Sequence, residues 1–325
     1  MTSSPKWPLS LNASLSTLAA NTNPLVLRGK PTNFCPMTAH TIVHADDIFP
    51  LTCSRSGTCC HGKMVWLNPW ELACLAKANG MPTRAFRDQF TEFGGIRLRF
   101  DGPPGWKGLP ACSQFDPERG CRVHTGRPLA CRLYPLGRQL LGKEEHYIFD
   151  GERFPCLVGC PEVQELPKMT VRDYLHGQHI GPGQVAQDAY LHTMQRLADG
   201  AFVLLIESGL AASGDKKTLR GWRANGQQHP KERAHQLPIE WLDRLLIPEL
   251  TQSLEDPQSY ADAHYNLLQE NAQNAFSHNH TKDGLREASC LMMSMALHLG
   301  RSLGSDPVQL ADRWIVTAKK HGAHE

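Results

Sequence analysis

The sequence predicts an α+β fold that is mostly α, in which a small, irregular, cysteine-rich domain precedes a helical C-terminal domain. Three observations lead to this prediction. Short elements alternate with Gly and Pro turns between residues 46 and 166, a cluster of eight cysteines lies in that stretch, and long amphipathic helical patterns follow residue 167. Because 41% of the residues are hydrophobic and 20% are charged, the chain has the composition of a folded globular protein.

The 325 residues divide by composition into three parts. Residues 1–45 are rich in Ser, Thr, Asn and Pro, which predicts an irregular N-terminal arm. Residues 46–166 form the predicted cysteine-rich domain, and residues 167–325 form the helical domain. Within the helical domain, residues 211–238 carry six Lys/Arg against two acidic residues, which predicts a polar connector.

The cysteine-rich part contains two predicted helices and two predicted strands. The first helix starts at Asn68, an N-cap followed by proline, and ends at Gly80. The second starts at Thr83 as its cap, carries phenylalanines on one face and ends at Gly94. Alternating residues predict strands over 96–100 and 147–149.

The C-terminal part reads as a series of capped helices. Thr170 and Gln184 open the first two, and a third follows Pro238 with a kink expected at Pro248. Asp256 and Asp306 each precede a proline, and each is expected to start one further helix. The His and Asn residues at 278–280 are expected in a loop.

The clustered cysteines are the candidate functional residues. Most of them lie beside Gly, Pro or Arg, which is typical of a ligand set rather than of a protein core. Thiolates bind soft metals, so this pattern predicts a metal or iron–sulfur site. Nearby arginines, at positions 55, 127 and 132, would offset the negative charge of several thiolates. The predicted metal ligands are Cys53, Cys59, Cys60, Cys112, Cys121, Cys131, Cys156 and Cys160.

Composition and charge exclude several other classes. The N-terminus has no sustained apolar run of the kind found in a secretory signal, so we expect a cytoplasmic protein with reduced thiols. The longest apolar stretch of the whole chain is too short to span a membrane. A net charge of +2 gives no general electrostatic reason to bind nucleic acid. Trp222 lies among the basic residues of 211–238, but no nucleic-acid motif accompanies it.

The cysteine pattern resembles that of the YkgJ-type cysteine-cluster proteins, a family described as zinc- or iron-chelating. That family has Cys-x-x-Cys-Gly-x-Cys-Cys, two further cysteines, Arg-Pro-x-x-Cys-Arg-x-Phe/Tyr-Pro and a later cysteine. The resemblance covers roughly residues 50–162 and implies that the cysteines bind zinc or iron. The family includes relatives of flagellin lysine N-methylases, so it also allows methyl-transfer chemistry. The matching residues are Cys53, Gly57, Cys59, Cys60, Cys112, Cys121, Arg127, Pro128, Cys131, Arg132, Tyr134 and Pro135, followed by Cys156 or Cys160.

Two departures from the family pattern bear on the ligand set. Ser56 stands where the family has its second cysteine, and His124 stands where an aromatic residue is common. A hydroxyl is a poorer ligand for a soft metal, so either one coordination position is open or Cys160 fills it. Ligation by His61 or His124 stays open. Cys74 and Cys290 sit among helical apolar residues, and we expect both to pack in the core.

The sequence therefore predicts a metal-binding cysteine-rich domain and leaves three functions open. The first is a cytoplasmic metalloprotein that binds an iron–sulfur cluster, with [4Fe–4S] favoured over zinc or iron ions by the abundance of sulfur. The second is an enzyme that uses this centre, for lysine methylation or redox modification of a protein or peptide substrate. The third is a zinc-stabilised adaptor whose helical half binds a protein partner.

Overall fold

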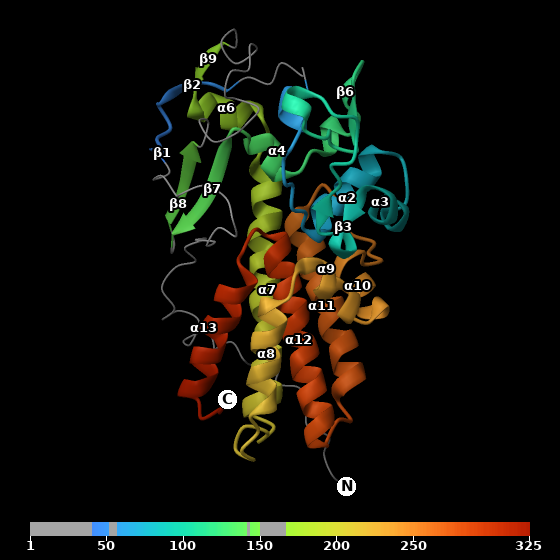
Figure 1. Ribbon diagram of the computed structural model, residues 1–325, viewed down its shortest axis with the longest axis vertical. Coiled ribbons are helices and arrows are strands. Elements are labelled where there is room, and N and C mark those ends of the chain that lie inside the picture. The colour runs from blue at the N-terminus through green and yellow to red at the C-terminus, as the bar shows by residue number, and fades with distance from the viewer. Residues whose placement is uncertain (1–40, 52–56, 142–143, 150–166) are drawn as a thin grey trace. The chain divides into compact units, whose positions relative to one another are not determined.

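A computed structural model describes residues 41–51, 57–141, 144–149 and 167–325 of the chain. The chain divides into two compact units. We call residues 25–187 with 253–257 the cysteine-rich unit, and residues 1–24, 188–252 and 258–325 the helical unit. Helices predominate over a few short antiparallel strands, which confirms the mostly-α α+β prediction (Figure 1).

The cysteine-rich unit is built from many short elements. These are β1 (Thr41–Val43), β2 (Ile48–Pro50), η1 (Thr58–Cys60), α2 (Pro69–Ala78), α3 (Thr83–Phe90), β3 (Thr91–Glu92), η2 (Phe93–Gly95), β4 (Arg97–Leu98), η3 (Trp106–Gly108), β5 (Phe115–Asp116), β6 (Gly120–Cys121), η4 (His124–Gly126), α4 (Leu129–Leu133), β7 (Leu136–Leu141), β8 (Glu144–Phe149), β9 (Lys168–Thr170) and α6 (Val171–Gly177).

All strand pairs in this unit are antiparallel among the described residues. Strands β1, β8 and β7 form one sheet, seen side by side in Figure 1, and β2–β9, β3–β4 and β5–β6 form two-stranded pairs. Apolar residues of β1, β7 and α6 share one hydrophobic core, which is independent of the cysteines. Its buried members are Val43, Leu51, Leu136, Val171 and Tyr174.

The local signals in this part gave mixed results. Asn68 caps α2 as predicted, since its side chain accepts from the Glu71 N–H and the Glu71 carboxylate accepts from the Asn68 N–H. Thr83 is the first residue of α3 rather than its cap, because Pro82 takes the cap position. The strand expected over 96–100 is shorter, and only Arg97 and Leu98 pair with β3. The strand expected at 147–149 lies within β8.

The helical unit contains long helices joined by short connections. Helix α7 (Gly181–Ile206) starts in the cysteine-rich unit, and the boundary between the units falls within it. The remaining helices are α8 (Lys217–Gln227), α9 (Pro230–Gln236), α10 (Ile239–Leu246), α11 (Pro257–Phe276), α12 (Lys282–Ser302) and α13 (Pro307–Lys320). None of the helices in the described part of the chain is both long and apolar enough to cross a membrane.

Two expectations for the C-terminal part are wrong. Residues 211–238 are not a polar connector, because they contain α8 and α9 and bury Trp222 and Arg233 completely. The Arg233 guanidinium donates to the carbonyl oxygens of residues 225, 226 and 228 and so closes the C-terminal end of α8. Helix α10 ends at Leu246, so Pro248 lies beyond the helix rather than kinking it.

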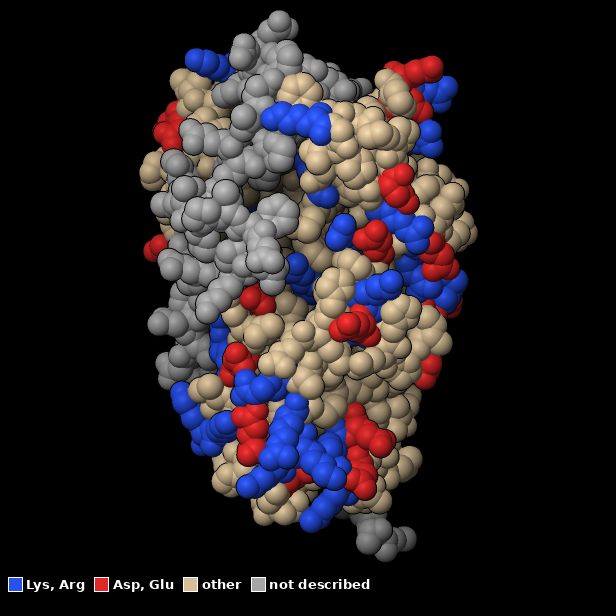
Figure 2. All heavy atoms as spheres, viewed as in Figure 1, with Lys and Arg blue, Asp and Glu red and all other residues tan. Residues whose placement is uncertain are grey.

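Other expectations for this part are confirmed. Thr170 caps α6, and Asp306 caps α13. The methionines of α12 are buried as predicted for core residues. Figure 2 shows Lys/Arg and Asp/Glu side chains interspersed over the lower part of this view. Arg223 and Glu325 form an ion pair. With Trp222 buried, no stacking ring accompanies the basic residues of 211–238.

Candidate metal centre

Gly57 has a left-handed backbone conformation and precedes Cys59 and Cys60, which we call the first cysteine segment. Gly57 has φ +79°, and the Cys60 N–H donates to its carbonyl oxygen at 2.7 Å, which closes the η1 turn that carries Cys59 and Cys60. A Cβ at Gly57 would lie 1.9 Å from the ring of Phe115. Both the backbone conformation and the packing therefore require glycine.

Backbone hydrogen bonds join the first cysteine segment to the second. The Cys112 N–H donates to the Cys60 carbonyl oxygen at 2.8 Å, and the Gly62 N–H donates to the Pro110 carbonyl oxygen at 3.0 Å. Phe115 pairs in turn with Cys121 across the β5–β6 hairpin. Four of the predicted ligands are thus placed by one continuous set of main-chain pairings.

The fifth described cysteine of the cluster comes from helix α4. Cys131 lies at the middle of this short helix, and Arg132 beside it holds the preceding loop. The Arg132 guanidinium donates to the carbonyl oxygens of Thr125, Arg127 and Gln178 at 2.7, 2.9 and 3.0 Å. Arg132 thus fixes the approach of α4 through backbone carbonyls.

The side chains of all five cysteines are half-buried and none forms a disulfide. A hydrogen bond from the Cys60 thiol lowers the pKa of Cys59 against the effect of burial, and the charges of Lys63 and Arg127 lower it further. The same hydrogen bond, with burial, raises the pKa of Cys60. The pKa values of the two neighbouring thiols are therefore shifted in opposite directions.

Two further thiols of the group have raised pKa values. Burial raises the pKa of Cys112 to about 11 and that of Cys131 to about 12. The charge on Cys121 raises the pKa of both, and that on Cys59 raises the pKa of Cys131. The five described thiols therefore interact electrostatically with one another. A bound cation would lower the free energy needed to ionise all of them.

Lys63 is the cation that the sequence analysis missed. Its charge lowers the pKa of Cys59, Cys60, Cys112 and Cys131, and its Nζ lies 3.0 Å from the centroid of the Tyr134 ring. Its position shortly after the adjacent cysteines was the available signal. Of the three arginines expected to offset thiolate charge, Arg127 acts on Cys59, Arg132 interacts with Cys131, and Arg55 lies outside the described residues.

The structure describes five of the eight predicted ligands. Cys53, Cys156 and Cys160 lie outside the described residues, as does Ser56. Among the residues that are described, no three His, Cys, Asp or Glu side chains are placed together closely enough to hold a metal ion. What the structure shows of the five described thiols is their electrostatic effect on one another.

His61 has a packing role in this arrangement. It is 7% exposed, and its Nδ1 lies 2.9 Å from the Gly57 carbonyl oxygen, which can only accept a hydrogen bond. Its other ring nitrogen faces Gly105, where a Cβ would lie 2.2 Å from Nε2. His61 therefore links η1 to the loop at 102–110, with main chain against its second nitrogen. His124 is half-buried at the start of η4.

Cys74 and Cys290 are the two described cysteines outside the predicted ligand set. Cys74 belongs to α2, and burial raises its pKa to about 12. Cys290 belongs to α12 of the helical unit, where its Sγ contacts the Thr218 carbonyl oxygen at 3.9 Å. Burial raises its pKa to about 11. Both are in the packing environments expected for them.

The arrangement of the cysteines agrees with the comparison with protein families. Residues 52–149 match the CxxCxxCC family, described as "Putative zinc- or iron-chelating domain". This confirms the resemblance to cysteine-cluster proteins and supports metal binding by the cysteines. The chelating-domain match includes Cys53 and the five described thiols, and ends before Cys156 and Cys160. It does not itself show a relation to flagellin lysine N-methylases. No curated protein and no solved structure matches the chain.

Proposed function

We propose that the protein is a cytoplasmic metalloprotein whose clustered cysteines bind an iron–sulfur cluster. The observation that carries this proposal is the group of five half-buried, electrostatically interacting thiols beside Lys63 and Arg127, within the segment that matches a zinc- or iron-chelating domain. The thiol state of the described cysteines suits a reducing compartment. Zinc bound by the same thiols is the alternative.

The donor chemistry of the site fits iron–sulfur binding. Cys59, Cys60, Cys112, Cys121 and Cys131 supply sulfur only, and His61 is held by main chain on both sides. Cys53, Cys156 and Cys160 are the further candidates. Thiolate ligands suit iron–sulfur clusters and Cys₄ zinc sites alike, and the number of available sulfurs favours the cluster. A bound cluster would supply one-electron redox chemistry.

Metal and sulfide analysis of protein purified without air tests the proposal. We expect a brown protein with iron and acid-labile sulfide in proportion to protein, and a visible absorption that bleaches on reduction. A colourless protein with stoichiometric zinc would show that the cysteines bind zinc rather than an iron–sulfur cluster. Protein that holds neither metal after purification or anaerobic reconstitution would refute metal binding.

Cysteine variants identify the ligands. Cys112→Ser and Cys131→Ser should each lower the metal content, because they remove a thiolate donor from the group. Cys74→Ala and Cys290→Ala are matched controls, since both delete a half-buried thiol outside the group. These controls should keep the metal content of the wild type, and a loss in either would show that the ligand set is misassigned.

A further inference from the structure

A buried carboxylate connects helix α2 to the helix that carries Cys131. Glu71 is 5% exposed, and both of its carboxylate oxygens accept hydrogen bonds from backbone N–H groups. One oxygen, Oε2, accepts from the Asn68 N–H at 3.1 Å, within the capping box of α2. The other, Oε1, accepts from the Leu129 N–H at 2.7 Å, at the first residue of α4.

The contact with Leu129 supplies what α4 lacks. The first N–H groups of a helix have no partner within the helix, and Pro128 at the cap position of α4 provides no side-chain acceptor. Glu71 fills this role from a distant part of the chain. Since α4 spans only Leu129–Leu133, the position of its first residue largely determines where Cys131 lies.

The chemistry of the contact calls for a carboxylate. An ionised carboxyl group offers acceptors on both oxygens, whereas a glutamine would turn an N–H donor toward one of the two backbone donors. Keeping this charge inside the protein is costly, and burial raises the pKa of Glu71 to about 7 against the two backbone hydrogen bonds and the charge of Arg132. An apolar residue or glutamine would serve packing alone at lower cost.

We propose that Glu71 is a positioning residue of the metal centre, which fixes the start of α4 and thereby holds Cys131 near the cysteines of η1 and the β5–β6 hairpin. This inference rests on the proposed function, because it assigns Glu71 to the same site. It makes α2 part of the support of the centre, although Cys74 on that helix is not a ligand.

The test compares Glu71→Gln with Asn68→Ala in the full-length protein. Both substitutions weaken the capping box of α2, but only Glu71→Gln also leaves a single acceptor oxygen for the Asn68 and Leu129 N–H groups together. The measurement is the affinity for the iron or zinc that the wild type holds, by competition with EDTA, with far-UV circular dichroism and thermal unfolding as checks of the fold.

We expect Glu71→Gln to weaken metal binding by about 10- to 100-fold, the usual loss when a residue that orients a ligand is changed. Asn68→Ala should lower thermal stability but change the metal affinity less than about threefold by the same reasoning. A merely structural role would reduce both properties in parallel in the two variants. If Glu71→Gln does not yield folded protein, the comparison is made with Glu71→Asp, which is too short to span both N–H groups.

Two outcomes overturn the inference alone. One is a wild-type metal affinity in Glu71→Gln, or in Glu71→Asp where that variant replaces it. The other is an equal loss of affinity in Asn68→Ala and in the Glu71 variant. In both cases the wild type still binds metal, and the proposed function stands. If the wild type binds neither iron nor zinc, the proposed function itself is refuted.

Discussion

The backbone N–H of Cys112 donates a 2.8 Å hydrogen bond to the carbonyl oxygen of Cys60. Two cysteine segments that are distant in sequence are therefore joined by main chain. The hydrophobic core around Val43 and Tyr174 is likewise built without cysteines. The framework around the thiols thus has its own sources of stability.

Metal removal should consequently leave the chain largely folded. We expect protein stripped with a chelator to keep most of its far-UV circular dichroism, with a lower unfolding temperature, because the stability added by metal binding grows with the logarithm of the free metal concentration and is lost when the metal is removed. Anaerobic chelation followed by thermal unfolding checks this. Collapse of the helical signal on chelation would show that the metal holds the fold together.

Gly57 should be intolerant of even the smallest side chain. Gly57→Ala places a methyl group against Phe115 and forces a non-glycine residue to φ +79°, so we expect a loss of at least about 3 kcal/mol in the free energy of unfolding. Gly108→Ala is the matched control, since Gly108 has φ +72° with nothing within 4 Å of its Cβ position. Its loss should be about 1–2 kcal/mol. Urea unfolding measures both, and equal losses would contradict a role for the Phe115 contact.

Lys63 should set the metal affinity of the thiols. Lys63→Met removes a charge that lowers the pKa of four cysteines, so their protons compete better with the metal. We expect metal affinity at pH 7 to fall about tenfold for each unit of increase in thiol pKa, and the loss to shrink as the pH rises. Lys63→Arg should retain most of the affinity.

The control for this prediction is Lys77→Met on helix α2. Lys77 is exposed and acts only on Cys74 among the cysteines with resolved pKa shifts. It should therefore keep the wild-type affinity. A fall of the same size in Lys63→Met and Lys77→Met would point to overall charge rather than to the place of Lys63.

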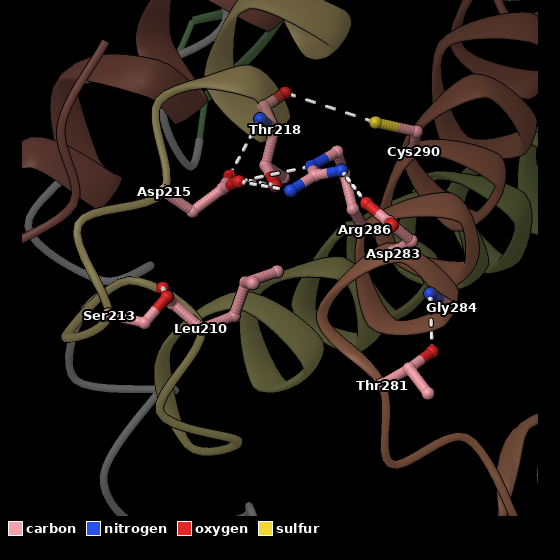
Figure 3. Close-up of polar contacts among 9 residues, drawn as sticks. All are labelled: Leu210, Ser213, Asp215, Thr218, Thr281, Asp283, Gly284, Arg286 and Cys290. Carbon is pink, nitrogen blue, oxygen red and sulfur yellow. Dashed lines mark hydrogen bonds and ion pairs between the residues drawn. The ribbon is translucent and has the colours of Figure 1, made fainter.

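Of the two carboxylates that pair with Arg286, Asp215 should contribute more to the free energy of unfolding. Figure 3 shows Asp215 between Arg286 and the first turn of α8, where its Oδ1 accepts from Arg286 Nη2 at 2.7 Å and its Oδ2 from the Thr218 N–H at 2.9 Å. The Asp215 side chain is 4% exposed, whereas that of Asp283, which also pairs with Arg286, is 81% exposed.

We therefore expect Asp215→Asn to lower the free energy of unfolding by about 2–3 kcal/mol, because it removes a buried, charge-assisted acceptor. Asp283→Asn should cost less than about 1 kcal/mol, as exposed pairs usually do. Equal effects in chemical unfolding would mean that burial of the Asp215 pair contributes nothing.

Stability should depend on pH through Glu71. Its pKa is about 7 in the folded chain against an ordinary value of 4.5, so the folded state binds the proton more tightly than the unfolded state. Its contribution to stability is then fully present below pH 4.5 and is lost as the pH rises toward about 7. Relative to Glu71→Gln, we expect the metal-free wild type to lose roughly 3 kcal/mol over this interval. Unfolding curves between pH 4.5 and 8 measure it, and parallel pH profiles of the two proteins would exclude the shift.

Local signals predicted helix starts well. Asn68, Thr170 and Asp306 all cap helices, because capping needs only residues within one turn of one another. The helices within 211–238 were missed because their surface is polar. Trp222 and Arg233 became informative only once packing showed that both are fully buried. Tertiary contacts decided these elements, and sequence periodicity did not reveal them.

The candidate site divides in the same way. The thiols were recognisable in the sequence, since residue type and spacing carry the chemistry. The role of Glu71 could not be predicted from local signals, because its second partner, Leu129, lies far away in sequence. The contacts of His61 with Gly57 and Gly105 were also beyond the reach of spacing, which left its ligation open.

The dependence of α4 on Glu71 has a consequence for biosynthesis. The ribosome synthesises Cys59, Cys60 and Glu71 well before Leu129 and Cys131. The Glu71 carboxylate is therefore present before α4, at a time when the early thiols are already exposed. A nascent chain that stops before α4 carries a smaller set of sulfurs with no partner for Oε1. The acceptor for α4 is therefore made before the helix whose first N–H it receives.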